Sequence, residues 1–145
     1  MNNQIIPEEE AVVSVYDSSI VTGDRTTEVV RTFRGSLFEL DKHIERLFLG
    51  MQEMDLEVPY TKEQLKNKTF QLLEMNKKND VTHLEWEIIY IVTRGIETMY
   101  HLFDLKDCKV NVIILCFPLA NRLQANVEKY HHGVKLLVSS QRQYL

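Results

Sequence analysis

Two side chains in the run LDKHIERL could contact an anion: His43 and Arg46. The guanidinium group of an arginine presents a planar fork of N–H donors that matches the oxygens of a phosphate. A lone arginine on an amphipathic helix is, however, more often a solvated or ion-paired surface group. His43, one turn earlier, is equally typical of a partly buried helix histidine. On these two residues alone, phosphate binding is one hypothesis beside an ordinary surface role.

No other motif in the sequence points to a known chemistry. There is no glycine-rich phosphate loop, no Cys/His spacing of a metal site and no serine-nucleophile elbow. The two cysteines, Cys108 and Cys116, flank and lie within an apolar run, so we expect reduced core residues rather than a disulfide. Motifs therefore leave the function open.

Composition excludes several classes of protein. The chain has 145 residues, of which 44% are hydrophobic and 26% charged, as expected for one soluble globular domain. Its net charge of −4 and scattered lysines give no basic surface for nucleic acid. No apolar run approaches the roughly 20 residues of a membrane span, and the N-terminal MNNQIIPEEE lacks the order of a signal peptide. We therefore expect no membrane partner and a cytoplasmic location.

The first half of the chain predicts a strand, a hairpin and two helices. AVVSVYD, with Val13 and Val15, is typical of a strand, and TTEVVRTFRGSLFEL predicts two strands around a turn at Arg34-Gly35. From Leu40 the apolar spacing becomes helical. Thr61 and Gln64 form a possible capping box at the start of a second helix, which ends near Asn79-Asp80.

The second half predicts mostly strands. LEWEIIYIVTRG and KVNVIILCFP are typical of central strands, residues 119–132 lose periodicity and indicate a linker, and GVKLLVSSQ predicts a further strand. The fold class is therefore α+β, with an antiparallel or mixed sheet and two helices on one face. The expected domains are residues 1–118, a linker at 119–132 and the start of a second domain at 133–145. The expected core comprises Val13, Val15, Ile44, Leu47, Leu72, Trp86, Ile88, Val112 and Ile114.

The order of these elements resembles a known family. The run VSVYDSSIVTGDRTTEVVRTFRGSLFELDKHIERL is similar to the N-terminal block of the class IV, fold-type IV pyridoxal-phosphate aminotransferases, which include branched-chain and D-amino-acid transaminases and aminodeoxychorismate lyases. IVTRG and GVKLLVSS resemble later strands of the family. The resemblance implies that Arg46 binds the phosphate of pyridoxal 5′-phosphate, that the substrates are an amino acid and a 2-oxo acid, and that the protein is a homodimer. Residues 133–145 would then begin the cofactor-binding domain.

The substrate pocket departs from the family pattern. Thr22 and Thr27 stand where the family often carries aromatic residues, which implies a smaller or more polar pocket on that side. His101 lies where D-amino-acid transaminases carry a carboxylate-binding histidine, but Met99 replaces the arginine expected beside it, and an ordinary loop histidine is the alternative. A branched-chain-like substrate is our expectation.

The family's cofactor-binding lysine has no counterpart in the sequence. In the family this lysine follows the strand that GVKLLVSS resembles, and it would fall beyond Leu145. We therefore expect the N-terminal portion of an aminotransferase, inactive by itself. The alternatives are a non-catalytic dimerising module of the same fold and an enzyme of the aminodeoxychorismate lyase type.

Overall fold

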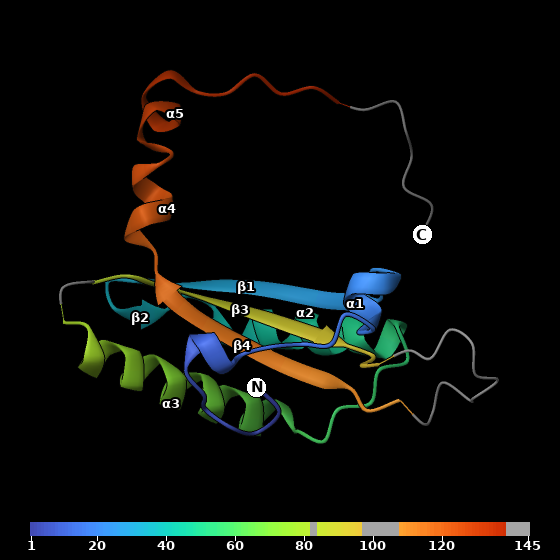
Figure 1. The fold of residues 1–145 in the computed structure, drawn as a ribbon. Coiled ribbons are helices and arrows are strands. Elements are labelled where there is room, and N and C mark those ends of the chain that lie inside the picture. Colours follow the sequence, from blue (N-terminus) through green and yellow to red (C-terminus); the bar gives the residue numbers. More distant parts are fainter. Residues whose placement is uncertain (82–83, 97–107, 139–145) are drawn as a thin grey trace.

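A computed structural model describes residues 1–81, 84–96 and 108–138 of the chain (Figure 1). Its elements, in chain order, are η1 (Glu8–Glu10), α1 (Ser18–Val21), β1 (Arg25–Phe33), β2 (Ser36–Leu37), α2 (Leu40–Glu53), α3 (Lys62–Asn79), β3 (Trp86–Thr93), β4 (Asn111–Pro118), α4 (Ala120–Gln124) and α5 (Val127–His132).

The strands form one antiparallel sheet in the order β2-β1-β3-β4. This confirms the predicted α+β class and settles the sheet as antiparallel. β3 is central, as predicted, because it pairs with β1 from Glu87 to Thr93 and with β4 along its whole length. β4 was also predicted to be central, and this was wrong: within the described ranges β4 lies at an edge of the sheet. Its apolar residues include Val112, which is buried, but most of the strand is only half-buried.

The β1–β2 hairpin turns where the sequence predicted. Arg34 and Gly35 both have positive φ, 52° and 76°, which is the geometry of the tight turns that match the twist of paired strands. β2 is only two residues long, because the chain enters α2 at Leu40. The hairpin therefore brings α2 directly back over β1.

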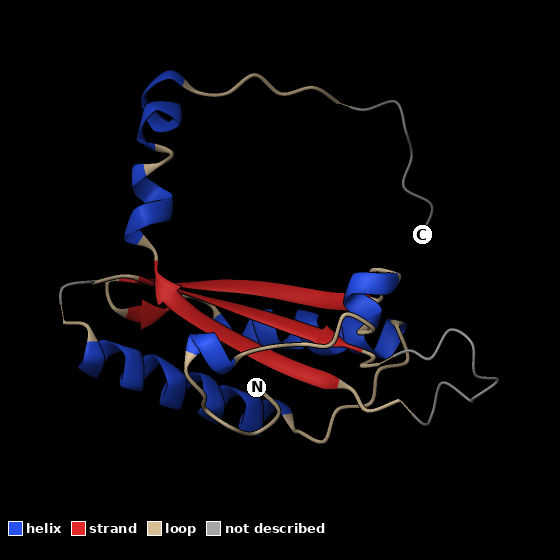
Figure 2. Ribbon diagram, viewed as in Figure 1, coloured by secondary structure: helices blue, strands red, loops and turns tan. Residues whose placement is uncertain are grey.

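Helices α2 and α3 lie on the same side of the sheet, as predicted (Figure 2). α2 buries Leu40, Ile44, Leu47 and Met51, which recur at helical spacing. α3 begins with the predicted capping box: the Thr61 side chain accepts from the backbone N–H of Gln64, and the Gln64 side chain accepts from the N–H of Thr61. The amphipathic pattern and the cap thus fix both helices.

The core lies between these helices and the sheet. Of the predicted core residues, Ile44, Leu47, Trp86, Ile88 and Val112 are buried, whereas Leu72 and Ile114 are half-buried. Leu73, next to Leu72, takes the inward position on α3. A polar contact also lies in the core, where the Tyr90 hydroxyl is 2.7 Å from the hydroxyl oxygen of Thr69.

The strand predicted at residues 11–17 does not form. Val13 and Val15 are 37% and 70% exposed, so placing them in the core was wrong. The reason lies at Asp17, whose buried carboxylate accepts hydrogen bonds from Ser19, Thr93 and Asn111. These bonds hold the segment across the end of the sheet, where it makes one bridge to Ile96 instead of a ladder.

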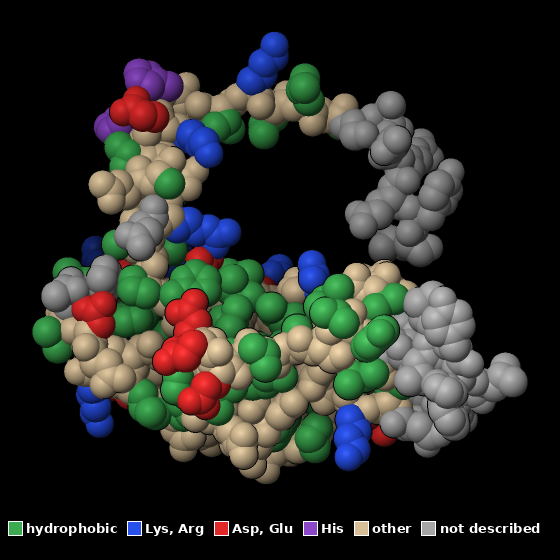
Figure 3. All heavy atoms as spheres, in the orientation of Figure 1, with side chains coloured by type: hydrophobic (Ala, Val, Ile, Leu, Met, Phe, Trp, Pro, Cys, Tyr) green, Lys and Arg blue, Asp and Glu red, His purple; other side chains and the backbone are tan. Residues whose placement is uncertain are grey.

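The segment after β4 is more ordered than predicted. Residues 119–132 were expected to be an aperiodic linker, but they contain α4 and α5. Leu119 is buried, and Arg122 of α4 binds the carboxylate of Glu87 on β3, so α4 is anchored to the sheet. Residues 133–138, predicted to begin a strand, form no helix or strand and stand clear of the domain body (Figure 3). Residues 139–145 lie outside the described part of the chain.

Candidate functional site

A buried carboxylate holds Arg46 by two hydrogen bonds. Arg46 Nε donates to Oε2 of Glu28 at 2.5 Å, and Arg46 Nη2 donates to Oε1 at 2.6 Å. The Glu28 side chain is 2% exposed, whereas that of Arg46 is 71% exposed. Paired bonds of this kind fix the plane of a guanidinium group. The fork of Arg46 is therefore held in place from beneath while its outer edge faces solvent.

His43 completes the same cluster. Its Nδ1 lies 2.9 Å from Glu28 Oε1, which also accepts from the backbone N–H of Val29 at 2.9 Å. Because an ionised carboxylate can only accept, His43 Nδ1 must be the donor. Glu28 thus receives four hydrogen bonds, and His43 acts on the carboxylate that holds Arg46.

These contacts lower the pKa of Glu28. Burial alone would raise that pKa, but the hydrogen bonds from Arg46, His43 and the Val29 N–H, together with the charge of Arg46, outweigh burial and bring the pKa to about 2. The same contact raises the pKa of Arg46 above its ordinary value. Both partners therefore stay charged throughout the physiological range of pH.

The positions of the three residues follow from the local fold. Glu28 shares a face of β1 with Val30 and Thr32, because alternate residues of a strand point the same way. His43 and Arg46 are three residues apart on α2 and so lie on neighbouring turns of one side. Packing of the buried stripe of α2 against the sheet brings that side over Glu28.

The C-terminal end of α2 is tied to the sheet by a second arginine. Arg94 Nη2 donates to the carbonyl of Met54 at 2.7 Å, and Arg94 Nε donates to Asp24 at 2.6 Å. Met54 is the C-cap of α2, Asp24 directly precedes β1, and Arg94 directly follows β3. This clamp fixes how far α2 can slide along β1, and therefore the register of Arg46 over Glu28.

Two of the predicted substrate residues, Thr22 and Thr27, lie elsewhere on the domain. Thr22 is the C-cap of α1, and its hydroxyl donates to the carbonyl of Ser18 at 3.0 Å. Thr27 is exposed on the face of β1 opposite to Glu28. His101 lies outside the described residues. The structure therefore unites Arg46 with Glu28 and His43, and it leaves the substrate roles of Thr22, Thr27 and His101 as predictions.

Glu28 is the residue that we did not single out from the sequence as part of the site. A signal was present: Glu28 shares the alternation of Val30 and Thr32, which are both buried. A carboxylate at an inward position of a strand needs charged or hydrogen-bonding partners. His43 and Arg46, in the helix that follows, were the candidate partners for this carboxylate.

The arrangement is suited to a phosphate group. Arg46 Nη1 makes no hydrogen bond to any part of the chain that the structure describes, so both of its N–H donors are available on the exposed edge. The fixed plane of the guanidinium adds direction to the charge, which is what a phosphate recognises. The residues present therefore fit the phosphate of pyridoxal 5′-phosphate. Cys116, by contrast, is no candidate nucleophile, because burial raises the pKa of its thiol to about 12.

Solved structures share this fold. The branched-chain amino acid aminotransferase of Escherichia coli superimposes with a TM-score of 0.71 at 19% identity, over 81% of this chain and 39% of that chain. The branched-chain amino acid aminotransferase of T.th., solved with pyridoxamine 5′-phosphate, gives a TM-score of 0.70 at 20% identity, over 81% of this chain and 38% of that one. The fold is thus that of the fold-type IV aminotransferases.

The sequence shows the family. The model of the amino-transferase class IV family matches residues 26–144, and the chain belongs to this family. A D-alanine aminotransferase of Listeria monocytogenes is 34% identical over 98 residues, which cover 67% of this chain and 32% of that protein. A putative branched-chain-amino-acid aminotransferase of Methanocaldococcus jannaschii is 31% identical over 120 residues, or 82% of this chain and 39% of that protein.

These relatives are much longer than the chain. The chain spans between 32% and 39% of the relatives and solved structures named above. The likeness therefore concerns one portion of an aminotransferase. In the described ranges, no helix is both long and apolar enough to cross a membrane.

Proposed function

We propose that the chain is the N-terminal portion of a pyridoxal-phosphate-dependent aminotransferase, in which Arg46 binds the cofactor phosphate. The observation that carries this proposal is the bidentate contact between Arg46 and the buried Glu28, which leaves Nη1 on an exposed edge. Membership of the class IV family supports the choice of cofactor, as does the pyridoxamine 5′-phosphate named with the second of the solved structures above.

Each residue of the cluster has a distinct task in this proposal. Arg46 binds the phosphate through Nη1 and contributes its positive charge. Glu28 fixes the orientation of the planar guanidinium, and the low pKa of Glu28 keeps it ionised. His43 donates to Glu28 and limits its rotation. When bound, pyridoxal phosphate supplies an electron sink for breaking bonds at the α-carbon of an amino acid.

The reaction we propose is transfer of an amino group between an amino acid and a 2-oxo acid. Thr22 and Thr27 would line the substrate pocket as small polar side chains. The Thr27 hydroxyl can donate a hydrogen bond to a carboxylate, whereas that of Thr22 already donates to the carbonyl of Ser18. His101 would add a further donor. A branched-chain-like substrate is our first choice, because Met99 stands where a carboxylate-binding arginine would favour D-amino acids; the relatives named above carry both activities in their names.

The remaining parts of the enzyme are proposed to lie in the cofactor-binding domain, which begins at residues 133–145 after the linker at 119–132. That domain would supply the lysine that binds the cofactor, and it would pack against the face of the sheet that α2 and α3 leave uncovered. The complete protein would be a cytoplasmic homodimer, and the 145-residue chain alone would be inactive. A non-catalytic dimerising module and a lyase of the aminodeoxychorismate type are the competing functions.

The test uses the full-length gene product with Arg46→Ala. We expect the affinity for pyridoxal 5′-phosphate, measured by equilibrium dialysis, to fall at least tenfold, because the fork that receives the phosphate is lost. Lys42→Ala is the matched control, since Lys42 is on the same helix, is exposed and pairs only with Glu39 among the described residues. Unchanged cofactor affinity in Arg46→Ala would overturn the proposed site. A full-length product that binds no cofactor would favour the non-catalytic module.

A further inference from the structure

Along one edge of the sheet, at β4, backbone N–H and C=O groups have no neighbouring strand to pair with in the described ranges. β4 pairs with β3 on one side only, and antiparallel pairing alternates, so every second residue of β4 directs its N–H and C=O outward. Val112 identifies the outward-directed residues, because its backbone N–H and C=O both form hydrogen bonds with Asn2 and not with β3. Ile114 and Cys116 follow at the same alternation. Their outward groups have no hydrogen-bond partner within the described ranges.

The N-terminal segment begins a ladder with β4 and then leaves it. The N–H of Asn2 donates to the carbonyl of Val112 at 2.9 Å, and the N–H of Val112 donates to Oδ1 of Asn2 at 2.8 Å. Asn2 and Asn3 have positive φ, 45° and 75°, so the chain turns away from the edge at once. The edge at Ile114 and Cys116 is therefore open to another strand.

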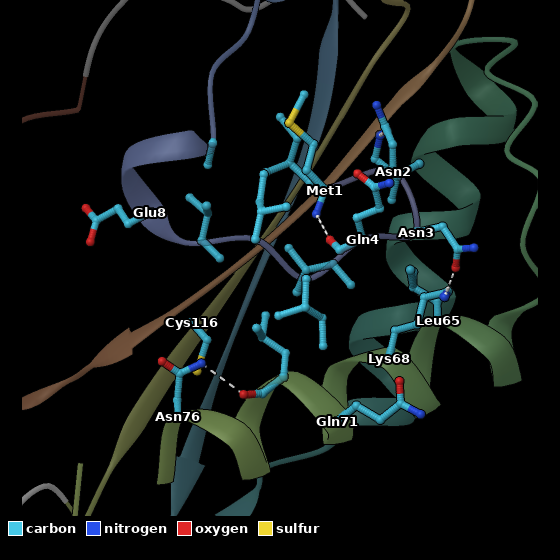
Figure 4. A pocket seen from close by; sticks show the side chains of 18 of the residues that line it. Met1, Asn2, Asn3, Gln4, Glu8, Leu65, Lys68, Gln71, Asn76 and Cys116 are labelled. Atoms are coloured by element: carbon cyan, nitrogen blue, oxygen red, sulfur yellow. Dashed lines mark hydrogen bonds between the residues drawn. The ribbon is translucent and has the colours of Figure 1, made fainter. Parts of the chain in front are cut away.

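A groove runs along this open edge. Its volume is 510 Å³, and it lies between the N-terminal segment, α3 and β4 (Figure 4). Aliphatic side chains line it, including those of Ile5 and Ile6 on one wall and Leu65 and Leu72 on the other. Residues 1–6 and α3 thus bound the groove on its two sides, and the edge of β4 lies along it.

A positive charge lies at one end of the groove. Lys68 of α3 is half-buried, bonds the amide oxygen of Asn3 and lies 5.3 Å from the ring centre of Tyr60. It has no carboxylate partner in the part of the chain that the structure describes. Its bond to Asn3, the neighbour of Asn2, places it near the Val112 end of β4. An antiparallel strand on β4 would bring its C-terminal end to this position.

We propose that the groove binds the C-terminal tail of another protein as an added β-strand. The tail is extended, has apolar or β-branched side chains, exchanges backbone hydrogen bonds with Ile114 and Cys116, and ends in a carboxylate that pairs with Lys68. Pro118, which has no N–H, limits the ladder at the far end. A second copy of the chain is a poorer occupant, since both copies carry a net charge of −4 and would repel each other.

The probe is the N-acetylated peptide Val-Thr-Val-Thr-Val with a free C-terminus, titrated into the 145-residue chain and followed by the backbone amide signals of β4 in two-dimensional NMR. We expect the largest shifts at Ile114 and Cys116. Methylation of the backbone nitrogens of peptide residues 2 and 4, which face the edge, should weaken binding about tenfold or more. Methylation at residue 3, which faces away, should change the affinity less than twofold.

Two further comparisons test the charge. Amidation of the peptide C-terminus and Lys68→Gln should each weaken binding severalfold. The two losses of affinity should not add when the changes are combined, because both changes remove the same ion pair. Lys78→Gln is the control, since Lys78 is an exposed residue of the same helix. Equal binding of the two methylated peptides, or no shift with millimolar peptide, would overturn the proposal. A dimer of the chain in sedimentation that excludes the peptide would overturn it in favour of a second copy.

Discussion

The two faces of the sheet are built from alternate residues of the same strands, yet they differ in how completely they are covered. On the helix face, Val30 and Ile88 are 1% and 0% exposed beneath α2 and α3, whereas Val29 and Phe33 on the open face are 40% and 56% exposed. Each face also holds a buried carboxylate bound by an exposed arginine. On the helix face that carboxylate, Glu28, has hydrogen bonds to both oxygens.

The second carboxylate is less completely bonded. Glu87, on the open face, binds Arg122 through Oε1, while its buried Oε2 has no hydrogen-bond partner among the described residues. The comparison teaches that this chain's own helices close the helix face, and that the buried carboxylate on that face is fully hydrogen-bonded. The open face is the one that we propose to pack against the remaining domain of an aminotransferase.

The largest expected effect comes from removing one side chain of the helix face. Ile88→Ala should lower the free energy of unfolding of the 145-residue chain by about 2–5 kcal/mol, because it leaves a cavity in a closed core. Urea unfolding followed by circular dichroism measures this value.

Its neighbour on the open face provides the matched control. Ile89 is half-buried and pairs with Val29 and Leu115, so Ile89→Ala should cost only about 1 kcal/mol. Equal losses in the two variants would show that the open face is as well packed as the helix face, and would remove the basis of the comparison.

A smaller effect is expected from pH. The pKa of Glu28 is about 2 in the folded chain, below its ordinary value of 4.5, so ionised Glu28 stabilises the fold above pH 4.5. This stabilisation is lost as the pH falls from 4.5 towards 2. Glu28→Gln should therefore show a shallower decline in the free energy of unfolding over this interval than the parent chain.

Glu45→Gln serves as the control for this measurement, because Glu45 is an exposed residue of α2. It should retain the pH dependence of the parent. If Glu28→Gln declined as steeply as the parent, the hydrogen bonds from Arg46 and His43 would not stabilise ionised Glu28 in solution.

Local patterns predicted most of the helix face. The hairpin turn at Arg34-Gly35, the apolar stripe of α2 and the capping box at Thr61 are each determined by a few neighbouring residues, and each is present. The prediction of a strand at residues 11–17 was wrong because the hydrogen bonds of Asp17 determine the conformation of this segment. The partners of Asp17, Thr93 and Asn111, are distant in sequence. No local pattern could show that contact.

The cluster of Arg46, Glu28 and His43 could not be assembled from the sequence for the same reason, and the role of Arg46 stays a prediction. Arg46 was singled out because the sequence resembles the family. Its partner Glu28 lies 18 residues earlier, and their contact depends on how α2 packs against the sheet. The two helices at 119–132 were missed because five- and six-residue helices carry too little periodicity, while the anchor from Arg122 to Glu87 again joins distant residues.

The central claim is that Arg46 binds a phosphate group, and the most direct measurement compares two ligands in the full-length gene product. The affinity for pyridoxal 5′-phosphate is divided by the affinity for pyridoxal, which lacks the phosphate, in the parent protein and in Arg46→Ala. We expect this ratio to fall at least tenfold in Arg46→Ala while the affinity for pyridoxal itself stays within twofold, because only the phosphate contact is lost. An unchanged ratio, whether both affinities fall together or neither falls, would contradict the assignment of Arg46 to the phosphate.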